Sequence, residues 1–195
     1  MTLAERILAT GAEIDEIADW LDHLDPGARI EQARALDPAA QRRLWRLTRG
    51  RAVALDDIVP PDRSALEPVR HYGRNTLPAF TLFEKRFCRP LAITEDDVLW
   101  GYNEGRTRPV VGPGYFICRA TDGDSRGEAV VDYTRVPPSK PAEWPTVRPN
   151  EWGLQRFVYA GMLDFLRRVS EHVTIGRAYR RDRETNNFFV LCREE

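Results

Sequence analysis

The residues YFICRATDGDSRGEAVVDYTRV, at positions 115–136, predict a β-hairpin in the middle of the fold. Two runs rich in aromatic and β-branched residues flank the polar, glycine-containing loop 122–127, which is the pattern of two antiparallel strands joined by a turn. Side chains alternate along a strand, so Ala129, Val131 and Tyr133 are expected on one face. The hairpin therefore indicates an antiparallel sheet.

Three further runs extend this sheet. Residues 98–102, 173–179 and 188–192 are short and apolar, and turn residues bound them. Between the hairpin and the last two runs, residues 137–149 hold five prolines, which excludes regular sheet there. We therefore expect about five strands.

A long helix is predicted after the proline-rich segment. Asn150 is a suitable N-cap, and the apolar residues that follow recur at helical spacing over more than four turns. They are Leu154, Phe157, Val158, Gly161, Met162, Phe165, Leu166 and Val169. The phenylalanines at positions 80, 83 and 87 also favour a helix, although the alternation of Phe80 and Leu82 permits a strand.

The N-terminal region is predicted to be helical and divided in charge. Thr2 and Glu5 form a capping box, and Asp37-Pro38 is a second helix start. Residues 1–25 hold seven acids and one base, whereas residues 26–51 hold seven arginines and two acids. We interpret the division as helices that attract each other across a hairpin; a docking surface for a protein partner is the alternative.

These elements predict the α+β class. A helical region at 1–51 precedes a linker or extended wrap at 52–76. An α+β domain follows at 77–195, in which a curved antiparallel sheet of about five strands packs on one long C-terminal helix.

Composition narrows the classes of partner. The net charge of −1 argues against a protein that binds the phosphate backbone of a nucleic acid. The three cysteines are widely spaced and form no CxxC pair, so we expect neither a metal site nor a cofactor. No apolar run approaches the ~20 residues that span a bilayer, and the N-terminus lacks the pattern of a signal peptide. We therefore expect a cytoplasmic protein with no membrane contact.

Eight residues are candidates for a ligand-binding site. Two glycine-rich turns with aromatic neighbours at positions 100–106 and 112–115 resemble the lining of a pocket, or the turns of a twisted hairpin. A histidine that titrates near neutral pH and an arginine that can hold an anion lie upstream. The eight are Trp100, Tyr102, Glu104, Arg106, Tyr115, Tyr133, His71 and Arg74.

The sequence supports three functional hypotheses. The first is a non-catalytic protein that binds a small, partly apolar molecule between the sheet and the long helix. The second is an accessory protein that docks through residues 1–51. The third is an enzyme that uses His71, Glu104 and Tyr133 as acid and base, which requires the three side chains to converge. No GxSxG, HExxH or phosphate-loop motif selects a reaction.

Overall fold

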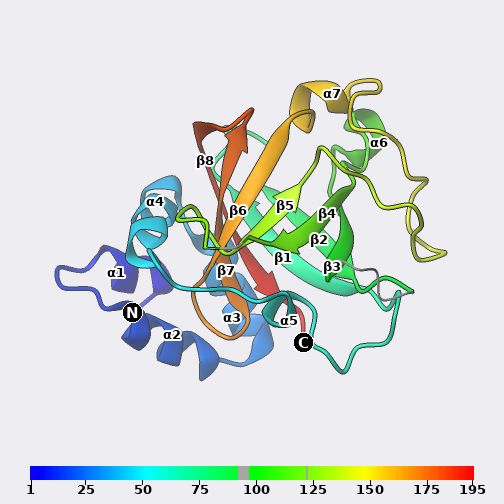
Figure 1. Cartoon of the computed structure of the whole chain (residues 1–195). Helices are drawn as coiled ribbons and strands as arrows, with labels where there is room; N and C mark the ends of the chain where they lie inside the picture. Colours follow the sequence, from blue (N-terminus) through cyan, green and yellow to red (C-terminus); the bar gives the residue numbers. More distant parts are fainter. Residues whose placement is uncertain (92–96, 122) are drawn as a thin grey trace.

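The computed structural model describes residues 1–91, 97–121 and 123–195, and its centre is a closed antiparallel β-barrel. The strands pair in chain order, and the last pairs with the first (Figure 1). They are β1 (Val69–Asn75), β2 (Leu82–Cys88), β3 (Val98–Glu104), β4 (Phe116–Ala120), β5 (Ala129–Asp132), β6 (Met162–Arg168), β7 (Val173–Arg180) and β8 (Arg183–Arg193). The helices are α1 (Leu3–Leu8), α2 (Ile14–Asp22), α3 (Pro26–Ala35), α4 (Pro38–Leu47), α5 (Leu55–Ile58), α6 (Arg108–Val111) and α7 (Gln155–Val158).

The predicted α+β class, with about five curved strands on one long helix, is wrong. The sheet has eight strands and closes on itself, because β8 pairs with both β7 and β1. The longest helices in the described part of the chain, α3 and α4, have 10 residues each. All five predicted strands form, as β3, β4, β5, β7 and β8, and their antiparallel pairing is confirmed.

The predicted long helix at 150–169 is a short helix followed by a strand. Only Gln155–Val158 is α-helical, and Gly161, with φ at +69°, precedes β6. Both faces of β6 are buried: Leu166 packs inside the barrel, whereas Phe165 packs outside under the N-terminal helices. Apolar residues are therefore needed on both faces, and this breaks the alternation of a strand and imitates a helical stripe.

The phenylalanine-rich segment also forms a strand rather than the favoured helix. Residues 82–88 build β2, with Phe83 and Phe87 pointing into the barrel, and Phe80 lies in the loop before this strand. The range 52–76, expected as a linker or wrap, contains α5 and all of β1. The predicted hairpin loop lies between β4 and β5, and Asp122 is outside the described residues.

Three glycine–phenylalanine pairs shape the barrel interior. Gly176 of β7 lies directly opposite Phe189 of β8, and a Cβ at Gly176 would lie 2.1 Å from the ring. The ring therefore occupies the space above the glycine. The same arrangement recurs between neighbouring strands at Gly73 with Phe83 and at Gly101 with Phe116. Close approach requires glycine at these positions, because any larger residue would displace a ring.

One end of the barrel is closed by α5. Leu55 and Ile58 of this helix pack with Phe87 and Leu99 from inside the barrel. The opposite end carries the loops β1–β2, β3–β4, β5–β6 and β7–β8, together with α6 and α7 (Figure 1). We call it the open end.

The N-terminal helices cover one side of the barrel. Leu3, Ile17 and Leu44 share a buried cluster with Phe165 and Ile175, which point outward from β6 and β7. The capping box at Thr2 and the helix start at Asp37-Pro38 are confirmed.

The proline-rich segment covers part of the outer face of β3 and β4. Trp144 packs on Tyr102, with the ring centroids 4.9 Å apart, and all three of Trp144, Tyr102 and Tyr115 are buried. The hydroxyl of Tyr115 donates to the carbonyl of Pro145 at 2.5 Å. The aromatics of this region therefore build an outer cluster.

Candidate functional site

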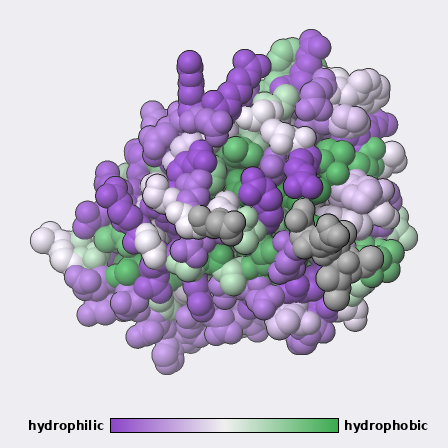
Figure 2. Space-filling view, viewed as in Figure 1, coloured by the Kyte–Doolittle hydropathy of each residue, from purple (hydrophilic) through white to green (hydrophobic). Residues whose placement is uncertain are grey.

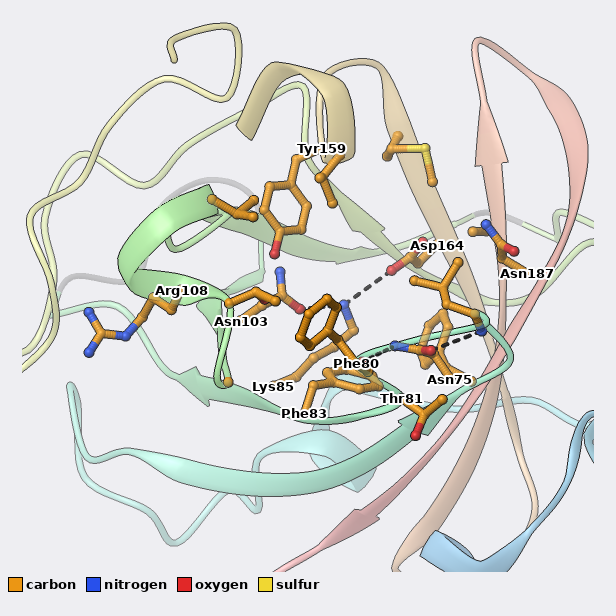
Figure 3. A pocket seen from close by; sticks show the side chains of 18 of the residues that line it. Asn75, Phe80, Thr81, Phe83, Lys85, Asn103, Arg108, Tyr159, Asp164 and Asn187 are labelled. Atoms are coloured by element: carbon orange, nitrogen blue, oxygen red, sulfur yellow. Dashed lines mark hydrogen bonds and ion pairs between the residues drawn. The ribbon is translucent and has the colours of Figure 1, made fainter. Parts of the chain in front are cut away.

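A cavity of about 740 Å³ lies at the open end of the barrel. It reaches from the loops down to the middle of the barrel, and most of its lining is apolar. Figure 3 shows Phe80 and Phe83 on one side, Tyr159 on another, and Lys85, Asn103 and Asp164 grouped inside. This volume falls within the ~300–1,000 Å³ of small-molecule sites.

A polar cluster forms the floor of this cavity. Lys85 Nζ donates to Asn103 Oδ1 at 3.0 Å, to Asp164 Oδ2 at 3.1 Å and to the Tyr133 hydroxyl. The four residues come from β2, β3 and β6 and from the position after β5, and all are buried. Register explains the convergence, because Lys85 lies opposite Asn103, and Tyr133 follows β5, next to β6.

Within the described residues, the cluster satisfies most of its own hydrogen bonds. An ammonium group has three protons, and all three of Lys85 are used. The Tyr133 hydroxyl accepts from Lys85 and Asn103 and donates to Asn103 Oδ1 or Asp164 Oδ2. Asn103 Nδ2 also donates to the Gly114 carbonyl. Lys85 and Tyr133 therefore have no hydrogen-bonding capacity left for a ligand.

Two polar groups keep free capacity on the cavity wall. Asp164 Oδ1 accepts no hydrogen bond from the described residues. This oxygen is not completely buried, so it is accessible from the cavity. The Tyr159 hydroxyl likewise has no partner in the described part of the chain, and its ring stacks on Tyr133 with centroids 5.3 Å apart. The floor thus offers a ligand one carboxylate oxygen and one hydroxyl.

Burial sets the protonation states of the floor. It lowers the pKa of Lys85, and the neighbouring Asp164 carboxylate opposes this by favouring the charged ammonium. The pKa of Tyr133 is raised well above its usual value, first by burial and then by Asp164. Burial also raises the pKa of Tyr159. Both phenols therefore stay protonated near neutral pH and act as donors or acceptors, not as bases.

Three of the eight residues predicted for the site line the cavity. Tyr133 lies on the floor, and Glu104 and Arg106 lie near the mouth. Glu104 accepts from Arg108 at 2.7 Å and from the hydroxyl of Tyr102 at 3.2 Å. Partial burial raises the pKa of Glu104, but the hydrogen bonds from Arg108, the Gly105 N–H and Tyr102, together with the charge of Arg108, outweigh it and lower this pKa overall.

The other five do not line the cavity. Tyr102 and Tyr115 belong to the outer aromatic cluster with Trp100. Arg74 points outward from β1 and donates to the carbonyl of Arg34 at 2.9 Å. His71 points into the barrel below the floor, where Nε2 donates to the carbonyl of Ile58 at 2.9 Å.

Sequence reasoning missed Lys85, Asn103, Asp164 and Tyr159. Lys85 carries the available signal: it stands at an inward position between Phe83 and Phe87, where a strand interpretation puts a charge inside the barrel. A buried lysine needs a partner, and Asp164 occupies a similar inward position beside Leu166. The helix interpretation of both segments removed this signal.

His71 predicts a pH dependence of folding. Burial lowers its pKa from 6.5 to about 3, with smaller contributions from Arg193, His172 and Lys85. The unfolded chain binds the proton first as pH falls below about 6.5, so stability decreases on acidification. We expect His71 to account for a loss of about 2 kcal/mol between pH 7 and pH 5, and His71→Met to abolish it.

Urea unfolding at a series of pH values measures this loss. His23→Gln, at the exposed end of α2, is the matched control and should keep the wild-type slope. A His71→Met protein with an unchanged slope would show that another group titrates.

The comparisons with known proteins give no relative. No protein-family model, no curated protein and no solved structure matches the chain. Within the described residues, no group of three or more histidine, cysteine, aspartate and glutamate side chains could hold a metal ion. The helices in this part of the chain are too short or too polar to cross a membrane.

Proposed function

We propose that this protein binds one small, largely apolar molecule inside its barrel, with a hydrogen-bond donor of the ligand directed to the floor. The observation that carries the proposal is the cavity of about 740 Å³, whose apolar wall ends at Asp164 and Tyr159. Barrels of eight strands hold one small ligand in other proteins, such as the lipocalins. The fold alone assigns no function, so the proposal rests on the cavity.

The polar atoms of the floor that have no partner among the described residues favour a ligand with a particular polar group at its end. Asp164 Oδ1 only accepts, so a hydroxyl or N–H group on the ligand can donate to it. A carboxylate at the same position would face the charge of Asp164, while the ammonium of Lys85 is already surrounded by three acceptors. We therefore expect alcohols and amides to bind, and carboxylates to bind weakly.

Three probes of equal chain length test this preference: decan-1-ol, its methyl ether and decanoate. Isothermal titration calorimetry should show the alcohol binding about tenfold more tightly than the ether, because a buried carboxylate oxygen then gains a donor. Decanoate should bind no better than the ether. Equal affinity for alcohol and ether would contradict the role given to the floor.

Filling the cavity tests its location. Ala178 points inward from β7 beside Asp164 and lines the cavity, so Ala178→Phe should lower the affinity for decan-1-ol about tenfold or more. Ala39→Phe makes the same change on the exposed side of α4 and should bind normally. Met162→Trp fills the cavity from β6 and replaces the first variant if that variant unfolds. Normal binding by folded, filled variants would place the ligand elsewhere.

The pocket is not the one predicted from sequence, which lay between a sheet and a long helix. The side chains of the three predicted acid–base residues do not converge either. His71 forms a hydrogen bond with the carbonyl of Ile58, Glu104 accepts one from Arg108, and Tyr133 forms hydrogen bonds within the floor cluster. The catalytic hypothesis depended on that convergence, so we do not propose it. The apolar faces of the N-terminal helices pack on the barrel, which leaves docking through residues 1–51 to their outer polar surface.

A further inference from the structure

Exposed apolar side chains gather around the open end of the barrel. Of the 11 large hydrophobic side chains exposed in the described part of the chain, eight lie on its loops or directly beside them. The most exposed of these eight are Val110 at 71%, Phe80 at 68%, Phe157 at 62% and Trp152 at 61%. Scattered exposed hydrophobic residues are ordinary, whereas a concentration of them around one cavity marks an interaction surface.

The surface at the end of the molecule opposite the open end is different in polarity. Figure 2 shows a mostly hydrophilic surface over α2 and α3 at the lower left. We call these eight exposed residues around the open end the apolar rim. They are Leu77, Phe80, Leu82, Val110, Trp152, Leu154, Phe157 and Val158.

The backbone holds one rim residue outward at a cost. Phe80 has φ at +54°, in the left-handed region that residues other than glycine rarely adopt. Such strain costs roughly 1–2 kcal/mol and concentrates at functional positions. The ring is nevertheless 68% exposed beside the cavity mouth, so no burial of the ring offsets this strain.

Positive charge accompanies the apolar rim. The guanidinium of Arg148 lies 4.8 Å from the Trp152 ring centroid, and that of Arg156 lies 4.7 Å from the Phe157 centroid. Neither arginine forms an ion pair with another described residue. The loops 76–81, 105–115, 133–161 and 181–182 hold seven bases and three acids, a net charge of +4, although the whole chain carries −1.

We propose that the open end docks on the surface of an anionic lipid bilayer. Tryptophan and phenylalanine side chains partition into the bilayer interface, and arginine stems lie along it while their guanidinium groups meet lipid phosphates. Basic residues gain further from the negative surface potential of anionic lipid. A second copy of the chain is disfavoured as the occupant, because two positively charged rims would repel each other.

Docking of this kind leaves no spanning segment in the sequence, since the contact comes from separate loops. It goes beyond the proposed function, because docking does not require an occupied cavity. If both hold, the cavity mouth faces the bilayer, and an apolar ligand passes between them without crossing water.

Vesicle flotation with the full-length protein tests the proposal. The probes are phosphatidylcholine vesicles and vesicles with phosphatidylcholine and phosphatidylglycerol at a ratio of about 7 to 3. We expect binding to the anionic vesicles, at least tenfold weaker binding to the neutral ones, and weaker binding as salt is raised, because salt screens the arginines.

Matched variants locate the contact. Phe157→Ser removes an exposed rim residue, and Leu8→Ser removes a comparably exposed residue of α1, 51% exposed. Arg148→Gln with Arg156→Gln removes two rim charges, and Arg42→Gln with Arg46→Gln removes two exposed charges of α4. Each rim variant should lower the partition coefficient about tenfold or more, and both controls should bind normally.

Ala178→Phe separates this proposal from the proposed function, because a filled cavity should leave vesicle binding intact. Absence of flotation at low salt, equal binding to neutral vesicles, or rim variants that bind like the controls would each overturn the proposal. A rim-dependent dimer in sedimentation velocity without flotation would also overturn it, in favour of a second copy.

Discussion

Replacing Lys85 by methionine should destabilise the protein by about 3–5 kcal/mol, because the change leaves the Asp164 carboxylate buried without its cation. The side chains of Lys85 and Asp164 are only 2% and 9% exposed, so water cannot replace the missing ammonium. The Tyr133 and Asn103 hydrogen bonds to the ammonium are lost as well. Urea unfolding at pH 7 measures the loss.

The pH dependence of this variant identifies the cause. Without the ammonium, the folded variant buries an unpaired carboxylate, and burial disfavours the charged form. A lower pH supplies the proton that removes this buried charge, whereas a higher pH keeps the charge in place. The deficit of Lys85→Met should therefore shrink on acidification.

A double variant separates charge from packing. Lys85→Met with Asp164→Leu removes both charges. Replacing a buried ion pair by apolar residues often leaves the stability of a protein unchanged or increases it. We expect it to recover most of the loss. Lys140→Met, which removes the only other lysine, is the matched control and should stay within about 0.5 kcal/mol of the parent. A double variant as unstable as the single one would mean that Lys85 contributes chiefly through its aliphatic stem.

The sequence was sufficient for the strands whose two faces differ and for those bounded by clear turns. Ala129, Val131 and Tyr133 were placed on one face, and all three lie inside the barrel. β6 was not recognised as a strand because the N-terminal helices bury its outer face. Its adjacent residues Phe165 and Leu166 are therefore both apolar, although they lie on opposite faces. Local periodicity cannot reveal a layer that is contributed from elsewhere in the chain.

Closure of the barrel depends on contacts that no local pattern encodes. β1 pairs with β8 in the register His71 to Arg193, across more than a hundred residues of sequence. The segment 71–75 resembles a loop in composition, and its Gly73 becomes understandable only beside the ring of Phe83. The site followed the same logic, since Tyr133 could be found on its strand but Lys85 and Asp164 required β2 and β6.

Removing residues 1–51 should prevent the remaining chain from folding as a stable monomer. The deletion uncovers outward-facing residues of the barrel wall that are now at most 5% exposed, including Phe165, Ile175, Phe188 and Val190. Burial of each such side chain contributes about 1.5–3 kcal/mol, and the stability of a whole domain is only about 5–15 kcal/mol. Uncovering four or more of them therefore consumes most or all of that stability.

Polar contacts strengthen the same junction. Arg167 of β6 donates to the carbonyl of Trp45 at 2.9 Å, and its guanidinium lies 3.8 Å from the Trp45 ring centroid. Arg29 of α3 is buried and pairs with Glu195 at 3.0 Å. These contacts join α3 to Glu195 and α4 to β6, so the deletion also removes one of the three backbone carbonyls to which Arg167 donates.

Circular dichroism and sedimentation velocity on residues 52–195 measure the outcome, with aggregation or loss of cooperative unfolding as the expected result. Co-expression of residues 1–51 as a separate chain is the control, and it should restore a soluble complex because the buried faces can still meet. A fragment 52–195 that is monomeric and unfolds at the parent temperature would instead show that the barrel is stable without the helical region 1–51. In that case the outer wall of β6 and β7 would itself be a surface that tolerates water, and the two-sided burial of β6 would not be a requirement of the fold.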